Sequence, residues 1–128
     1  MKGFIVNLEK ATLDNSDYRR VLYTAKHSQL VLMSIEPGGE IGEEVHELDQ
    51  FIRLEAGQAL VVLNGVEQQV QADEAFIIPE GVRHNVINNG TEPLKLYTVY
   101  SPPEHKDGTV QPTKADEKEE HFDGVTSE

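Results

Sequence analysis

Short segments of apolar residues run along the chain from Tyr18 to about Tyr100. They are rich in Val, Ile, Leu, Phe and Tyr, and clusters of Gly, Asn, Asp and Pro separate them, a pattern typical of strands joined by turns. None sustains the period of an amphipathic helix. The expected strands are Tyr18–Ala25, Gln29–Ile35, Glu43–His46, Gln50–Leu54, Ala59–Leu63, Gln68–Val70, Ala75–Ile78, His84–Asn88 and Leu94–Tyr100. The pattern therefore predicts an all-β domain.

Turn signals indicate how these strands connect. Asn64-Gly65 lies between two apolar segments, and this dipeptide readily adopts the positive φ angles of a two-residue hairpin turn. Asn89-Gly90 marks a second turn before Leu94. About eight or more short antiparallel strands must close on themselves or stack as two sheets, since otherwise edges and apolar faces stay exposed. We expect a jelly-roll β-barrel from about Tyr18 to Ser101.

The two ends of the chain differ from this central part. Residues 1–103 are expected to form one barrel domain with an N-terminal arm, because Phe4–Leu8 is apolar and a polar stretch separates it from Tyr18. Residues 104–128 carry eight acidic residues and three lysines. They contain too few apolar residues to form a core of their own. This acidic C-terminal segment is expected to be either a disordered tail or an arm that lies on a neighbouring surface.

Charge and composition narrow the class of protein. The 128 residues carry a formal net charge of -12, a field that repels nucleic-acid phosphates and anionic lipids. The absence of cysteine excludes thiolate metal sites, disulfides and cysteine nucleophiles. The N-terminus reaches charged residues too soon for a signal peptide, and no apolar run approaches a membrane span. We expect a cytoplasmic protein with no nucleic-acid or membrane partner.

Four side chains form the candidate site. Glu44 and His46 are two residues apart, so in an extended segment both point to the same face and can bind one ion. Gln50 begins the next expected strand and can return beside His46, while His84 follows a turn and opens another strand. Met33, Phe51, Phe76, Tyr97 and Tyr100 are expected in the core or pocket walls. His27, His105 and His121 are expected on the surface, with a pocket mouth as the alternative for His105, because it closely follows the last expected strand.

The spacing of these residues resembles the two sequence motifs of the cupin superfamily. The first motif reads here as Gly38, five residues, Glu44-Val45-His46, three residues, Gln50, six residues and Gly57. Its spacing is intact, but Glu44 replaces the motif's first His and Gln50 replaces its Glu. The second motif appears as Asp73, five residues, Pro79-Glu80-Gly81-Val82-Arg83-His84 and Asn88. Only its first Gly is missing.

The resemblance covers roughly residues 18 to 101 and implies a jelly-roll barrel. The chain is similar to small bacterial single-domain cupins, often labelled mannose-6-phosphate isomerase-like, in Asp49-Gln50-Phe51 and in the stretch from Tyr100 to His105. Carried over residue by residue, the resemblance implies a metal site of Glu44, His46, Gln50 and His84. Two imidazoles, one carboxylate and an amide suit one divalent transition metal ion: Mn, Fe, Ni, Co or Zn. Gln50 can ligate the ion directly or hydrogen-bond to its bound water.

Three functions are compatible with this site. The first is a metal-dependent, isomerase-like enzyme acting on a small polar molecule such as a sugar or sugar acid, in which the metal polarises an oxygen. The second is a non-haem metal dioxygenase, since two His and one carboxylate resemble the ligands of such iron sites. The third is a non-catalytic binding module, which the loss of the usual His and Glu favours. A homodimer is expected, because an N-terminal strand or arm can cover a partner's sheet edge.

Overall fold

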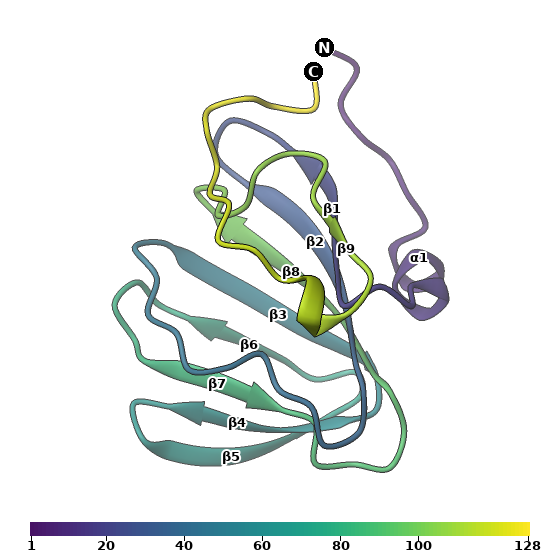
Figure 1. The fold of residues 1–128 in the computed structure, drawn as a ribbon, viewed down its shortest axis with the longest axis vertical. Helices are drawn as coiled ribbons and strands as arrows, with labels where there is room; N and C mark the ends of the chain where they lie inside the picture. The colour runs from purple at the N-terminus through teal and green to yellow at the C-terminus, as the bar shows by residue number, and fades with distance from the viewer.

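The computed structural model describes residues 1–128, and nine strands dominate it (Figure 1). The strands are β1 Arg19–Thr24, β2 Gln29–Ile35, β3 Asp49–Ala56, β4 Gln58–Leu63, β5 Val66–Gln71, β6 Ala75–Ile78, β7 His84–Ile87, β8 Leu94–Ser101 and β9 Val110–Gln111. A six-stranded sheet has the order β6-β3-β8-β2-β1-β9, and a three-stranded sheet has the order β5-β4-β7. Every pairing is antiparallel. The predicted all-β jelly roll is confirmed.

The predicted Asn64-Gly65 hairpin is present and fixes the register of β4 and β5. Asn64 and Gly65 have φ angles of 48° and 81°, as the two central residues of this turn require. Leu63 pairs with Val66 on either side, and the ladder continues to Gln58 and Gln71.

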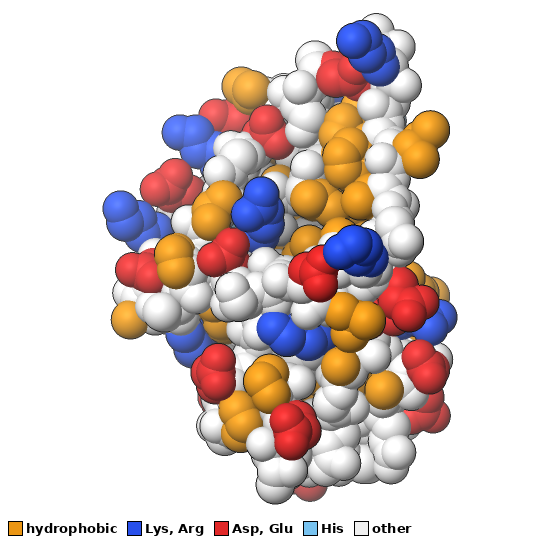
Figure 2. All heavy atoms as spheres, turned by 90° about the vertical axis from the view of Figure 1, so that its right-hand side faces the viewer, with side chains coloured by type: hydrophobic (Ala, Val, Ile, Leu, Met, Phe, Trp, Pro, Cys, Tyr) orange, Lys and Arg blue, Asp and Glu red, His pale blue; other side chains and the backbone are white.

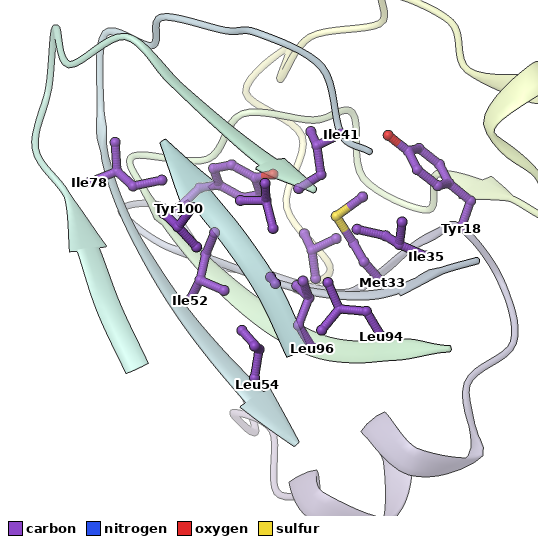
Figure 3. Packing of buried hydrophobic residues seen from close by; sticks show 14 of the residues in the cluster. Tyr18, Met33, Ile35, Ile41, Ile52, Leu54, Ile78, Leu94, Leu96 and Tyr100 are labelled. Atoms are coloured by element: carbon purple, nitrogen blue, oxygen red, sulfur yellow. The ribbon is translucent and has the colours of Figure 1, made fainter. Parts of the chain in front are cut away.

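The core lies between the two sheets and contains 16 buried hydrophobic residues. Met33, Leu94 and Leu96 from the middle of the larger sheet point toward the same interior as Ile52 of β3 (Figure 3). Val61 and Val86 of the smaller sheet are also buried there. Gln50, Ile52 and Leu54 alternate along β3 as its buried residues, so the interior also receives Gln50.

The same alternation corrects the placement of two aromatic residues. Phe51 lies between buried Gln50 and buried Ile52 and therefore faces the other side of the sheet. Its ring centroid is 6.2 Å from that of Tyr97, which is half-buried between Leu96 and Thr98, both buried. Phe51 and Tyr97 thus do not belong to the core. Met33 and Tyr100 are buried as predicted.

The N-terminal region contains a helix that the sequence pattern did not predict, α1 Leu8–Asp14. Asn7 caps it, since its side chain accepts a hydrogen bond of 3.1 Å from the amide of Lys10. Seven residues are too few for a convincing helical period. Thr12 is fully buried.

The loop between β2 and β3 also differs from expectation. Glu43–His46 is not a strand, and Glu44 alone forms a bridge to His84. Two backbone hydrogen bonds of 2.9 Å join these residues, one in each direction. The bridge ties the loop to the start of β7 and sets the position of the candidate site.

The C-terminal segment, residues 104–128, lies against the barrel and passes across its front (Figure 1). β9 pairs with β1, a short 3₁₀ helix η1 Lys114–Asp116 follows, and His105 forms a bridge with His121. The two termini meet, because both carboxylate oxygens of Glu128 accept hydrogen bonds from the amides of Lys2 and Gly3. No helix has the length and apolar character that a membrane crossing requires.

Candidate functional site

Three elements bring the predicted site residues to one end of the barrel. Glu44 and His46 lie in the β2–β3 loop, Gln50 lies near the start of β3, and His84 begins β7. Gln50 pairs with Tyr100 of β8, and the ring of Tyr100 lies 6.0 Å from that of His46. All four residues are therefore grouped around one end of the interior.

His46 is the centre of this group. Its ring centroid lies 5.1 Å from that of His84. Its Nε2 is 3.3 Å from an oxygen of Glu44, and its Nδ1 is 3.6 Å from an oxygen of Glu104. The His46 side chain is only 10% exposed. A nearly buried imidazole thus lies between two carboxylates and beside a second imidazole.

Burial shifts the pKa values of His46 and Glu44 in opposite directions. It lowers the pKa of His46 from its usual range, with His84 and Arg19 acting in the same direction and Glu104 opposing them. Burial also raises the pKa of Glu44, against the nearby charges of Arg19 and His84. His46 is therefore biased toward the neutral form that can bind a metal. Glu44 keeps its proton to a higher pH than an ordinary glutamate, a property of groups that transfer protons.

His84 is fixed in one orientation. Its Nδ1 lies 2.9 Å from the carbonyl oxygen of Val82, a distance at which the ring N–H donates to that oxygen. In that tautomer Nε2 is the free acceptor, the arrangement that metal-binding histidines commonly adopt. The turn from Pro79 to Val82, closed by a backbone hydrogen bond of 3.2 Å, places this carbonyl before His84.

Gln50 is 3% exposed and is only half satisfied. Its Nε2 donates to Oγ1 of Thr98 at 3.1 Å, whereas its Oε1 has no hydrogen-bond partner. A buried amide oxygen without a partner costs about 1–3 kcal/mol. An oxygen in this condition is a ready ligand for a cation or a water.

His105 lines the hollow beside the site, which agrees with the alternative that the sequence left open for it. Its Nε2 is 3.3 Å from the hydroxyl of Tyr100, and its backbone amide and carbonyl both bond to Gln29. Burial, together with the charges of Arg19 and His46, lowers the pKa of His105 to about 3. His105 is therefore neutral at pH 7 and belongs to the wall of the site. His27 and His121 are exposed, as predicted.

Two further residues of the site were missed by the sequence reasoning. Glu104 lies between His46 and His121, accepting from His121 at 3.0 Å. Arg19, at the start of β1, is 3% exposed. Glu104 lies within the family-like stretch from Tyr100 to His105, so its position was a usable signal. For Arg19, only strand alternation distinguishes it from Arg20.

A hollow of about 510 Å³ lies beside this group, and Glu44 is the one predicted metal ligand among its lining residues. Its walls include Arg19, Glu44, Glu104 and His105, and the C-terminal segment supplies Lys114 and the residues from Glu117 to His121. Only one lining residue is hydrophobic. The hollow is large enough for a small molecule, and its lining is suited to a polar one.

The donor set fits a divalent ion in chemistry, although the side chains do not converge on one point. No group of three or more His, Cys, Asp or Glu side chains is arranged to hold an ion. The partnerless oxygen of Gln50 and the oriented ring of His84 are nevertheless the features of prepared ligands.

Comparison with known proteins is consistent with this architecture. Residues 31–100 match the Cupin domain family. The chain is 45% identical over 122 residues to the uncharacterized protein YrkC of Bacillus subtilis, covering 90% of this chain and 66% of that protein, slightly under two thirds of its length. The crystal structure of BH2720 from Bacillus halodurans superposes with a TM-score of 0.88 at 46% identity, covering 90% of this chain and 92% of that one. An RmlC-like cupin from Shewanella frigidimarina, at 23% identity and a TM-score of 0.61 over 66% of this chain and 74% of that one, shares the fold. The chain belongs to the cupin family.

Proposed function

We propose that the protein is a metal-dependent cupin enzyme, isomerase-like, that acts on a small polar molecule such as a sugar or sugar acid. The observation that carries this proposal is the meeting of His46, His84 and Glu44 beside a polar hollow of about 510 Å³. Polar lining favours a hydroxylated or charged substrate over an apolar one.

Glu44, His46, Gln50 and His84 would hold the ion. A bound divalent metal supplies Lewis acidity, polarising a substrate carbonyl or enediolate oxygen. Burial raises the pKa of Glu44, so a proton competes with the ion for this carboxylate at a higher pH than it would for an ordinary glutamate. Burial also raises the pKa of the Tyr100 hydroxyl, which therefore remains a hydrogen-bond donor throughout the physiological range.

The test begins with metal content. Protein made without a polyhistidine tag should contain close to one equivalent of a divalent transition metal by elemental analysis. The double variant H46A/H84A should lose it and keep the circular dichroism of a β protein. H27A, which removes an exposed histidine, is the matched control. Unchanged metal content in H46A/H84A would overturn the assignment of ligands.

Turnover separates the enzyme from two other candidates. Interconversion of sugars or sugar acids that stops in H46A/H84A supports the isomerase-like enzyme. Oxygen consumption with Fe(II) would favour a dioxygenase, for which two His and one carboxylate are typical ligands. Ligand binding with no turnover under any metal would favour a binding module, the function that Gln50 in place of the motif's Glu supports.

A further inference from the structure

Arg19 is a buried cation whose role the metal site does not explain. It is 3% exposed and lines the same hollow as Glu44 and Glu104. One of its guanidinium nitrogens, Nε, has no hydrogen-bond partner. Burying a guanidinium is costly unless anions or acceptors satisfy it, so a charge kept in this position needs a counter-group.

The counter-group comes from the C-terminal segment. Nη1 of Arg19 donates to Oε2 of Glu117 at 2.9 Å and to Oε1 of Gln111 at 2.7 Å. The other oxygen of Glu117 lies 3.2 Å from Nζ of Lys114, and the hydroxyl of Tyr18 lies 3.4 Å from Oε2. Both oxygens of one carboxylate are thus bound by cations at the edge of the hollow.

The charge of Glu117 is well stabilised there. Partial burial opposes its ionisation, but hydrogen bonds and charges from Arg19 and Lys114 outweigh it and hold its pKa below the usual range. Glu117 is the only acid of the C-terminal segment that contacts Arg19. Glu119 and Glu120 line the same hollow and make no ion pair.

The backbone around Glu117 is weakly tied to the barrel. Tyr18 donates to the carbonyl of Pro112 at one end, and Phe122 donates to the carbonyl of Glu104 at the other. Between these two points the backbone hydrogen bonds stay within the segment: the amides of Asp116, Glu117 and Glu120 donate to carbonyls two or three residues earlier. Side-chain contacts therefore hold this stretch over the hollow. Lys114 donates to the carbonyl oxygen of Ile41 at 2.8 Å, Glu117 binds Arg19, and His121 lies 3.0 Å from an oxygen of Glu104.

We propose that Arg19 and Lys114 form a carboxylate-binding subsite, and that Glu117 occupies it in place of a ligand. Residues 115–121 are then a lid that the carboxylate of Glu117 holds closed, while Lys114 stays bound to the carbonyl oxygen of Ile41 at 2.8 Å. An acidic small molecule displaces Glu117 when it enters. This inference deepens the proposed function and rests on it, because it selects carboxylic acids such as sugar acids among the small polar substrates. It requires no bond making or breaking.

The first experiment measures competition by Glu117. Malonate is titrated calorimetrically into EDTA-treated wild type, E117Q and E119Q. E117Q removes the competing charge and should bind malonate up to about tenfold more tightly than wild type. In wild type only the molecules in which Glu117 has left Arg19 can bind malonate, and this reduces the apparent affinity. E119Q changes the net charge equally without touching Arg19 and should bind as wild type does. Equal affinities in E117Q and E119Q would overturn the proposal.

The second experiment tests the cations and the lid. K114Q, a substitution at an exposed position, should weaken malonate binding to E117Q, and R19Q should abolish it. If circular dichroism shows that R19Q, which removes a buried group, is unfolded, K114Q alone decides. Malonate should also speed hydrogen exchange of residues 115–121 in wild type. Unchanged exchange together with unchanged affinity in K114Q would contradict the subsite. Neither readout uses metal or turnover, so a failure of the metal proposal stays distinguishable.

Discussion

Nε2 of Gln50 donates a 3.1 Å hydrogen bond to the hydroxyl of Thr98, while Oε1 of the same amide is buried without a partner. This half-satisfied amide stands where the cupin motif has a carboxylate. The bond to Thr98 fixes the nitrogen, and the oxygen is left for a cation or a water. The role of Gln50 can therefore be tested by restoring the carboxylate.

Q50E should have opposite effects with and without metal. In EDTA-treated protein the buried carboxylate should lower the free energy of unfolding by roughly 1–3 kcal/mol, because it lacks a cation partner. With metal, it should tighten binding, since a carboxylate is a better ligand than an amide. Urea unfolding and metal titration measure the two effects. Q68E, on exposed β5, makes the same charge change and should show neither effect.

How far the sequence predicted the molecule depends on the range of each interaction. The Asn64-Gly65 turn depends on a local dipeptide, and that prediction holds, whereas Phe51 on β3 was placed on the wrong face of the sheet. The sequence pattern did not predict helix α1, because its seven residues are too few to show a helical period. The contact between Arg19 and Glu117 was not predicted, because it joins residues 98 positions apart. In addition, the composition of the C-terminal segment suggested disorder as readily as order.

Two turn glycines should respond differently to alanine. Gly65 has φ +81° and open space where a Cβ would lie, so G65A should cost only backbone strain of about 1–2 kcal/mol. Gly57, the last glycine of the first motif, has φ +86°, and a Cβ there would lie 2.9 Å from the carbonyl oxygen of Pro93. G57A should therefore cost roughly 1–3 kcal/mol more than G65A. Equal urea midpoints for the two variants would show that the contact with Pro93 relaxes freely.

Dimerisation through the N-terminal segment stays a prediction. Phe4 stacks on Tyr23 of the same chain at 5.1 Å, while Ile5 is 98% exposed beside it. Figure 2 shows hydrophobic side chains gathered on the upper half of the face that bears α1. At micromolar concentration, sedimentation should give a dimer, and I5E should weaken association about tenfold or more, because it would bury an unpaired charge. V66E, at an exposed position on β5, is the control. A wild-type monomer would end this prediction.

His105 should make stability depend on acid pH. Its pKa is near 6.5 in an unfolded chain and about 3 in the folded protein, where burial and the charges of Arg19 and His46 oppose protonation. Between these values the unfolded chain binds more protons, so the free energy of unfolding rises with pH. The stability is fully present above about pH 6.5 and is lost as pH falls toward 3, by up to roughly 1.4 kcal/mol per pH unit.

H105Q should flatten this part of the pH profile, because glutamine does not titrate. His46, whose pKa burial also lowers, is present in wild type and H105Q alike, so the difference between the two profiles reports His105 together with its interaction with His46. Urea unfolding from pH 7 to pH 4 measures this difference, and EDTA treatment removes the contribution of protons released by metal binding. H27Q removes an exposed histidine and should keep the wild-type slope. If H105Q and H27Q show the same slope, the His105 ring is more hydrated than its contact with Tyr100 implies.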